Sequence, residues 1–174
     1  MSSLLETFPV RQQRYKYDCG ICSIWCVLRY LGYNFSYWDI YKLLGPDIKD
    51  GVDGEEIEKL FKKLKVNFIA EKSTIHKLQM YSNKNFPTIV SIQHRKEYNK
   101  EWKDTRKYGH YAIVLKVTKN KILLMDPKYG KIKSLTIENF KERWHDSDGE
   151  IFYKNCAITC MPKTIKYKNG IKIK

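Results

Sequence analysis

The spacing of apolar residues changes once along this chain, near Val66, and that change limits the possible folds more than any other feature of the sequence. Before Val66, apolar side chains recur every three or four residues, as on one face of a helix. After Val66 they form short runs and alternations that are typical of strands. Helices followed by strands favour an α+β fold with an antiparallel sheet over alternating βαβ units.

Three helices are predicted in the first part of the chain. Each begins at a residue that can cap a helix, namely Asp18, Ser36 and Asp53. The first continues to Leu31 and the third to Leu64, whereas the second, which opens with a capping-box pattern, ends at Gly45-Pro46. Apolar residues at helical spacing give each of them a face that can be buried.

The second part is predicted to supply the sheet. The expected strands cover residues 66–70, 88–92, 111–117 and 122–125, with further strand at Phe152 and over 157–161, and a short helix over 75–81. With 174 residues the chain is long enough for one domain and too short for two. We expect that domain to span residues 1–162 and the lysine-rich segment 163–174 to be a loose basic tail.

Cys19 stands at the expected start of the first helix. Free backbone N–H groups and the positive end of the helix dipole favour a thiolate at that position. A thiolate that cleaves an amide needs an acid to protonate the leaving group, and that acid is usually an imidazole held by a third polar group. His110 and Asp126 are the candidates for these two positions.

The predicted hairpin of the third and fourth strands brings His110 and Asp126 together. Thr118 to Asn120 would form a three-residue turn, in which Asn120 can take the left-handed conformation. The resulting pairing puts Ala112 opposite Asp126, and His110 lies one diagonal step away with a Cβ separation of about 7–8 Å. A two-residue turn would place the two side chains on opposite faces, so the hypothesis requires the odd-length turn.

Acyl chemistry also needs a hydrogen-bond donor for the oxyanion that develops on the substrate. The side-chain amide of Gln13, six residues before Cys19, can supply one beside the backbone N–H of Cys19. Gln12 is the competing candidate.

These residues form a recognisable pattern. Gln13 precedes the motif Asp18-Cys19-Gly20, and the second half consists of Gly109-His110-Tyr-Ala-Ile-Val114, Asp126-Pro127-Lys-Tyr-Gly130, Phe140 and Trp144. The pattern resembles that of the bacteriocin-processing cysteine peptidases that remove double-glycine leaders, and the resemblance covers about residues 9–161. Those peptidases are normally fused to an ABC transporter, which this sequence does not contain, so the chain resembles a stand-alone member.

The resemblance implies a papain-like fold, in which a helix bearing the cysteine packs on an antiparallel sheet that carries histidine and then aspartate. It implies that Cys19 is the nucleophile, His110 the general acid and base, Asp126 the residue that orients His110, and Gln13 the oxyanion donor. It also implies that the substrate is a peptide or protein and that no cofactor is needed.

Charge and composition point to the surroundings of the chain. Lys and Arg number 33 against 19 Asp and Glu, so the net charge is +14 and the surface would attract nucleic acid, anionic lipid or acidic proteins. The abundance of Lys, Asn, Ile and Tyr is also typical of an AT-rich genome. Because no stretch is long and apolar enough for a membrane span and residues 1–10 do not form a signal peptide, we expect a cytoplasmic protein.

Several alternatives remain open at this stage. The fold could be a catalytically silent peptide-binding module, an acyltransferase with the same residues, or a basic nucleic-acid-binding protein. The four thiols of Cys19-x-x-Cys22 and Cys156-x-x-x-Cys160 could bind zinc. The basic and aromatic segment 95–108 is either an exposed loop or a flap over the cleft, and His76, His94 and His145 are assigned to surface or structural positions.

Overall fold

The computed structural model describes residues 3–45, 51–147 and 152–163, and the backbone alone at 167–168 and 171–172. The helices are α1 (Leu4–Thr7), α2 (Cys19–Tyr30), α3 (Tyr37–Leu44), α4 (Gly54–Lys63), α5 (Ile75–Asn83), the 3-10 turn η2 (Trp102–Asp104) and α6 (Ile137–Arg143). The strands are β1 (Asn67–Lys72), β2 (Thr88–Gln93), β3 (Gly109–Val117), β4 (Lys121–Asp126), β5 (Lys131–Thr136), β6 (His145–Ser147), β7 (Phe152–Lys154), β8 (Cys156–Met161), β9 (Tyr167–Lys168) and β10 (Ile171–Lys172).

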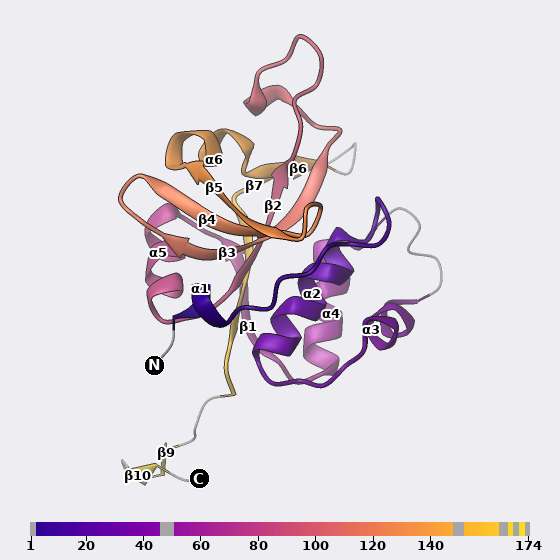
Figure 1. Cartoon of the computed structure of the whole chain (residues 1–174), viewed down its shortest axis with the longest axis vertical. Coiled ribbons are helices and arrows are strands. Elements are labelled where there is room, and N and C mark those ends of the chain that lie inside the picture. Colours follow the sequence, from indigo (N-terminus) through magenta and orange to yellow (C-terminus); the bar gives the residue numbers. More distant parts are fainter. Residues whose placement is uncertain (1–2, 46–50, 148–151, 164–166, 169–170, 173–174) are drawn as a thin grey trace.

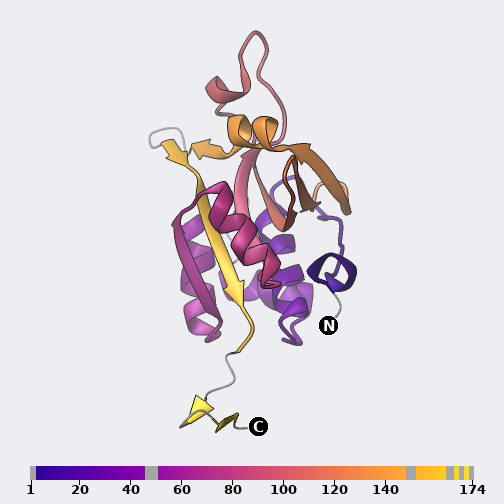
Figure 2. The ribbon, with the colours of Figure 1, turned by 90° about the vertical axis from the view of Figure 1, so that its left-hand side faces the viewer.

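A six-stranded sheet forms the centre of the molecule, with the strand order β1-β8-β2-β3-β4-β5 (Figure 1). Every pair of neighbouring strands in it is antiparallel. The C-terminal strand β8 lies between β1 and β2, where it joins the first strand to the rest of the sheet (Figure 2). The α+β class with an antiparallel sheet, predicted from the change in apolar spacing, is confirmed.

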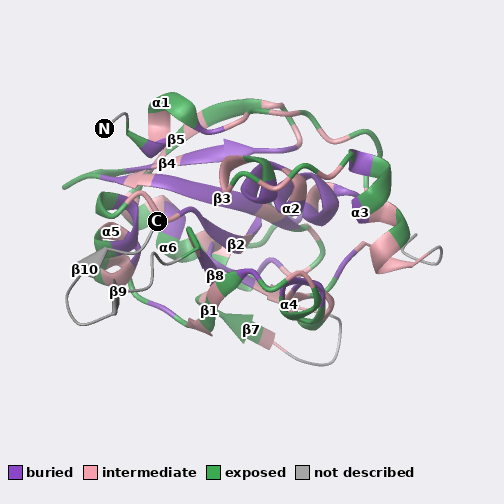
Figure 3. Ribbon diagram, turned by 90° about the horizontal axis from the view of Figure 1, so that it is seen from below, coloured by how far each residue is buried: buried purple, intermediate pink, exposed green. Residues whose placement is uncertain are grey.

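Helices cover both faces of this sheet. On one face, α2, α3 and α4 enclose a core in which Ile24 packs in the same cluster as Leu115 of β3. On the other face, Leu78 of α5 and Phe140 of α6 belong to a second cluster with Val114. The central strands β3 and β4 are consequently buried over most of their length (Figure 3). Each fully buried large apolar side chain stabilises the fold by about 1.5–3 kcal/mol.

The three predicted helices are confirmed, and two of their caps form as the sequence indicates. Ser36 and Asp53 each accept a hydrogen bond from the backbone N–H three residues on, and the acidic residue there binds back to the cap, so both are capping boxes. The second predicted helix, α3, ends at Leu44, and its C-cap residue Gly45 has a positive φ of 115°. Pro46 lies outside the described residues.

The turn between β3 and β4 differs from the predicted one. Val117 pairs with Ile122, and the Thr118 N–H donates to the Lys121 carbonyl at 2.8 Å, so the turn contains two residues instead of three. Among the described residues, the asparagines with positive φ are Asn85, Asn99 and Asn155, which means that Asn120 does not take the left-handed conformation.

A β-bulge in β3 shifts the pairing of β3 with β4 by one residue between the turn and the open end of the hairpin, where His110 and Asp126 lie. The pairing shifts by one residue after Val114, and Ile113 lies opposite Met125. Continued by one residue, this register places Asp126 on the face of the sheet that carries His110. The predicted face is therefore right, although the predicted reason, an odd-length turn, is wrong.

The sequence patterns missed several short elements, namely α1, β5, α6 and β6. The start of α6 carried a usable signal, because Thr136 accepts a hydrogen bond from the Asn139 N–H as an N-cap. In the C-terminal segment, β9 pairs with β10, and its remaining residues after 163 lie outside those described. The boundary at residue 162 stays a prediction.

No helix in the described part of the chain has both the length and the apolar character needed to cross a membrane.

Candidate active site

Cys19 is the first residue of α2, and its side chain is partly exposed. The next residue, Gly20, lets this end of the helix approach the sheet closely. A Cβ at Gly20 would stand 3.1 Å from Val52 and 3.3 Å from the Tyr111 ring on β3. A side chain here would push α2 away from β3, the strand that carries His110, so the glycine of the Asp-Cys-Gly motif has a packing role.

Asp18 holds the turn before α2 instead of capping the helix. It occupies the N-cap position, but its carboxylate makes no capping hydrogen bond to α2. Its two oxygens accept hydrogen bonds from the N–H groups of Arg14 and Tyr15, at 3.1 and 2.9 Å, and from the Tyr37 hydroxyl at 2.5 Å. The helix dipole and the free N–H groups at Cys19 are thus left without a capping side chain, while the segment that carries Gln13 is fixed in place.

His110 and Asp126 lie in direct contact at the end of the β3–β4 hairpin. The distance from His110 Nε2 to Asp126 Oδ1 is 2.8 Å, and both side chains are largely buried. Because an ionised carboxylate only accepts hydrogen bonds, Nε2 carries the hydrogen in this contact, which leaves Nδ1 as the second ring nitrogen.

Asp126 has two further partners. The Lys128 N–H donates to Oδ1 at 3.0 Å, and the Lys133 ammonium lies 3.4 Å from Oδ2. Lys133 comes from β5, an edge strand that the apolar pattern did not reveal. A single lysine in an exposed-looking strand carries no local signal for such a contact, so the sequence analysis missed it.

The electrostatics favour a charged pair. Burial alone would lower the pKa of the His110 ring, but its hydrogen bonds to Asp126 and Cys19, and the negative charges of both, raise that pKa from 6.5 to about 9. Burial raises the pKa of the Asp126 carboxyl, yet its contacts with His110, Lys133 and the Lys128 amide lower the pKa overall. The Asp126 carboxylate therefore stabilises the protonated form of the His110 ring.

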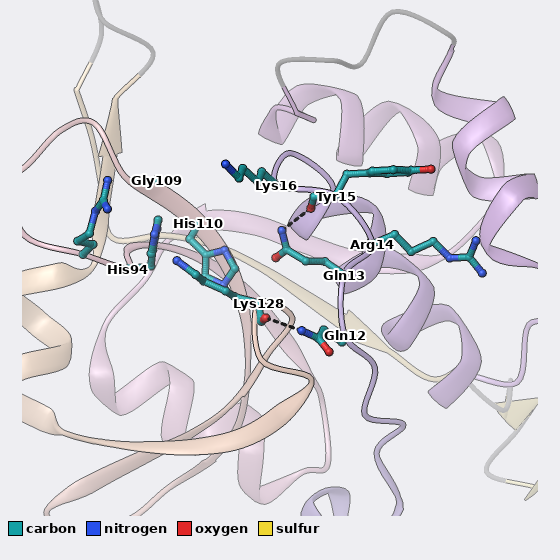
Figure 4. Close-up of a pocket in the computed structure, with 10 residues that line it drawn as sticks. Gln12, Gln13, Arg14, Tyr15, Lys16, His94, Gly109, His110 and Lys128 are labelled. Atoms are coloured by element: carbon teal, nitrogen blue, oxygen red, sulfur yellow. Dashed lines mark hydrogen bonds between the residues drawn. The ribbon is translucent and has the colours of Figure 1, made fainter.

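The two candidate glutamines point to different places (Figure 4). Gln13 projects toward His110; one of its side-chain N–H groups donates to the Tyr15 carbonyl at 2.6 Å, and its Oε1 is buried without a hydrogen-bond partner in the described structure. Gln12 is exposed and donates to the Lys128 carbonyl at 3.3 Å. The backbone N–H of Gln13 donates to the carbonyl of Pro127 at 2.8 Å, so this segment is tied to the turn that follows Asp126.

A cavity of about 450 Å³ opens beside these groups, and Gln13 and His110 both line it. His94, assigned from the sequence to a surface or structural position, lines it too, with its ring centroid 5.6 Å from that of His110. Burial and the nearby charge of Lys128 lower the pKa of His94 to about 4, so its ring is neutral at physiological pH. The structure thus brings His110 into contact with Asp126, and it places Gln13 and His110, but not Cys19, among the residues that line the adjoining cavity.

Comparison with known proteins places this arrangement in a family, because residues 7–148 match the peptidase C39 family. The chain belongs to the peptidase C39 family. Its matched region covers both halves of the pattern identified in the sequence, and C39 domains are cysteine peptidases. This chain is therefore a C39 cysteine peptidase domain, as the resemblance implied.

Curated relatives of this C39 domain are longer proteins. One is the lactococcin-G-processing and transport ATP-binding protein LagD of Lactococcus lactis, 30% identical over 73% of this chain. Another is the sublancin-168-processing and transport ATP-binding protein SunT of Bacillus subtilis, 24% identical over 74% of this chain. The aligned region spans 16% of the length of each relative.

Solved structures share the fold. The peptidase domain of Streptococcus ComA, a bifunctional ABC transporter, has a TM-score of 0.68 at 22% identity and covers 90% of this chain and 99% of that one. A protein from Bacillus anthracis described as a C39-like peptidase has a TM-score of 0.72 at 14% identity. The match covers 94% of this chain and 99% of that one. A double-glycine-motif protease in complex with the leader peptide has a TM-score of 0.62 at 14% identity. The match covers 89% of this chain and 91% of that one.

The four thiols that could have bound zinc do not come together. Cys22 and Cys160 are fully buried in the apolar core, and Cys156 contacts the Lys154 carbonyl. Among the described residues, no group of three or more His, Cys, Asp or Glu side chains is arranged to hold a metal ion. The described positions of these thiols give no support to the zinc alternative.

The segment 95–108 connects β2 to β3 and projects from the sheet as a loop (Figure 1). Hydrogen bonds and an ion pair within the loop hold it together. The buried Glu97 carboxylate accepts hydrogen bonds from the N–H groups of Arg106 and Lys107, at 2.7 and 3.3 Å, and pairs with Lys100 at 2.9 Å. Trp102 is fixed under the Arg143 guanidinium, 4.4 Å from its ring centroid. These contacts describe an ordered loop, and its proposed action as a flap stays a prediction.

The raised pKa of His110 predicts an alkaline limit of activity. We expect kcat/KM to fall as the pH rises through about 9, because a neutral ring cannot protonate the leaving amine. The protonated ring also stabilises the folded state. This contribution is complete below pH 6.5 and is lost as the pH rises through about 9. Asp126→Asn removes one of the charges that raise this pKa, so the limit should move down by about one pH unit or more.

The matched control for this pH profile is Glu138→Gln, which removes the same charge from an exposed position at the start of α6. It should leave the alkaline limit in place. An unchanged limit in Asp126→Asn would show that Asp126 does not set the charge state of His110.

Proposed function

We propose that this domain hydrolyses a peptide bond through a covalent acyl-enzyme on Cys19. The observation that supports it most directly is the His110 ring, which lies 2.8 Å from Asp126 Oδ1 and whose pKa is raised by Asp126 and by Cys19. A thiolate, a proton donor and a group that orients the donor are the three requirements of nucleophilic amide cleavage.

The proposed reaction begins with attack of the Cys19 sulfur on the substrate carbonyl carbon. The oxyanion that forms is bound by the second side-chain N–H of Gln13 and by the backbone N–H of Cys19, which has no partner within the first turn of the helix. His110 then gives its proton to the departing amine, and the C–N bond breaks. Water, deprotonated by the same ring, attacks the thioester and releases the carboxylate product.

The names of the relatives support a proposal for the substrate class. LagD and SunT are named for processing lactococcin G and sublancin 168, and a solved neighbour is a double-glycine-motif protease in complex with a leader peptide. We infer that this domain cleaves a leader peptide after a pair of glycines. The aligned region makes up 16% of those two relatives, so the likeness does not extend to their transport and ATP-binding parts.

Two matched peptides test this proposal. One carries Gly-Gly before the bond to be cleaved and the other carries Ala-Ala in the same context. We expect kcat/KM for the Gly-Gly peptide to be higher by at least about tenfold, because two added methyl groups must be accommodated in the cavity. Mass spectrometry of the products should show a free carboxylate after the second glycine. Cleavage of neither peptide, or a product joined to an added amine, would contradict hydrolysis.

The silent-module, acyltransferase and nucleic-acid alternatives gain no support from the proteins named above. The cytoplasmic location stays a prediction.

A further inference from the structure

The cavity beside His110 is lined by positive charge. Four cationic side chains, Arg14, Lys16, Arg95 and Lys128, are among the ten residues that line it, and no carboxylate is. The carboxylate behind the cavity, that of Asp126, is already bound to His110, to the Lys128 N–H and to Lys133. The wall that a substrate would face is therefore cationic.

Three of these cations, Lys16, Arg95 and Lys128, are close in sequence to residues of the candidate active site. Lys128 follows the Asp126-Pro127 pair, and its backbone N–H binds the Asp126 carboxylate. Lys16 follows Tyr15, whose carbonyl holds the Gln13 amide. In Figure 4 the Lys16 and Lys128 side chains extend toward the part of the cavity where His94 and His110 lie.

Arg95 is placed by its neighbours. It follows His94, whose ring packs 5.6 Å from that of His110, and its guanidinium lies 3.9 Å from the centroid of the Tyr108 ring. Burial lowers the pKa of His94, and the nearby charges of Lys128 and Arg95 lower it further. Arg14 differs, because its guanidinium packs over the Tyr37 and Trp38 rings and points away from His110 (Figure 4).

The three cations are not neutralised within the described structure. Lys96 and Lys100, in the loop that begins at Arg95, are paired with Glu101 and Glu97. By contrast, Lys16, Arg95 and Lys128 form no ion pair with any described residue. Charged groups left unpaired at the mouth of a cavity steer and select ligands of the opposite charge.

We propose that the substrate peptide carries acidic side chains within a few residues of the cleaved bond, and that Lys16, Arg95 and Lys128 bind them. This inference rests on the proposed function and narrows its substrate class. Because an extended peptide advances by about 3.3 Å per residue, side chains on both sides of the bond lie within reach of lysine and arginine at the cavity mouth.

A peptide fits these cations better than a nucleic acid does. A single strand would need open aromatic faces on which its bases could stack. The ring of Tyr108 is covered by Arg95, and that of Trp102 by Arg143. Tyr15 lines the cavity and is exposed, but one face of its ring stacks on Tyr17, with centroids 5.5 Å apart. Tyr98 is 91% exposed, but it lies out on the projecting loop.

The test measures binding separately from hydrolysis. Two fluorescent peptides share a Gly-Gly centre; one has Asp and Glu at the flanking positions, and the other has Asn and Gln. Their affinities for the Cys19→Ala variant of the full chain are compared at low and high salt. We expect the acidic peptide to bind about five- to tenfold more tightly at low salt, and the difference to shrink at high salt.

Variants locate the effect. The double variant Arg95→Gln with Lys128→Gln should reduce the affinity ratio of the two peptides to near one. Lys119→Gln is the matched control, because it removes a positive charge at the exposed turn at the opposite end of β3, and it should keep the ratio. Equal affinities for the two peptides would overturn the inference, as would an equal loss in Lys119→Gln.

Two further measurements separate the possible failures. A single-stranded oligonucleotide that displaces the acidic peptide at equal concentration would assign the cations to nucleic acid and overturn the inference. Hydrolysis of both peptides by the unmodified chain is followed in parallel. Hydrolysis without an acidic preference contradicts this inference alone, whereas an acidic preference in binding without hydrolysis contradicts the proposed function alone.

Discussion

Cys19→Ala is expected to abolish peptide hydrolysis, with kcat/KM falling by about 10⁴-fold or more. The reason is that the variant removes the only atom proposed to bond to the substrate, and a methyl group cannot form the acyl-enzyme. Labelling by a peptide that carries a thiol-reactive electrophile should be lost at the same time, as measured by intact-mass spectrometry. Residual labelling at the rate of the unmodified chain would show that another cysteine is the nucleophile.

Cys22→Ala is the matched control for that experiment. Cys22 lies one turn further along the same helix, is fully buried, and donates to the Arg11 carbonyl at 3.4 Å. Burial and the neighbouring Cys26 raise the pKa of this thiol. We expect hydrolysis and labelling to persist in this variant, with some loss of thermal stability. An equal loss of activity in the two variants would point to packing in place of catalysis.

Gln13→Ala is expected to lower kcat by about 10²- to 10³-fold with little change in KM, because an oxyanion donor acts mainly in the transition state. Gln12→Ala provides the comparison at the neighbouring position, where the side chain is exposed and bound to the Lys128 carbonyl. Its activity should stay within about threefold of the unmodified chain. The measurement is steady-state kinetics on the Gly-Gly peptide.

Gln13 also holds the Tyr15 carbonyl, so loss of that contact has to be separated from loss of the donor. The melting temperature of Gln13→Ala separates the two effects. Loss of the oxyanion donor alone should lower kcat at an unchanged melting temperature, whereas loss of the Tyr15 contact as a structural link should lower the melting temperature as well. A larger effect in Gln12→Ala than in Gln13→Ala would transfer the proposed role to Gln12.

The contacts around Asp126 explain why the site was only partly predictable. The motif residues Asp18, Cys19, His110 and Asp126 are visible as a pattern because each one stands at a helix start or a strand end. The carboxylate of Asp18, however, binds the turn before α2 and the Tyr37 hydroxyl, and no local rule distinguishes that from an ordinary cap. Lys133 and His94 reach the site from other strands, and their sequence neighbours carry no hint of it.

The β3–β4 hairpin also shows which features the sequence predicted and which it did not. A turn of two residues would have separated His110 from Asp126, and a bulge after Val114 restores the register. The bulge is an irregularity in the pairing of β3 with β4, and the residues of the turn carry no signal for it. The sequence predicted the right pair of residues on one face, but by a geometry that the chain does not use.

By itself, the sequence determined the α+β class, the first three long helices with two of their caps, the main strands and the family, since these depend on local periodicity, caps and motif residues. Only the tertiary structure decided the bulged register, the partners of Asp18 and Asp126, the direction of Gln13 and the cationic lining of the cavity. Those features depend on contacts between residues far apart in the chain, whose distances are set by packing on both faces of the sheet.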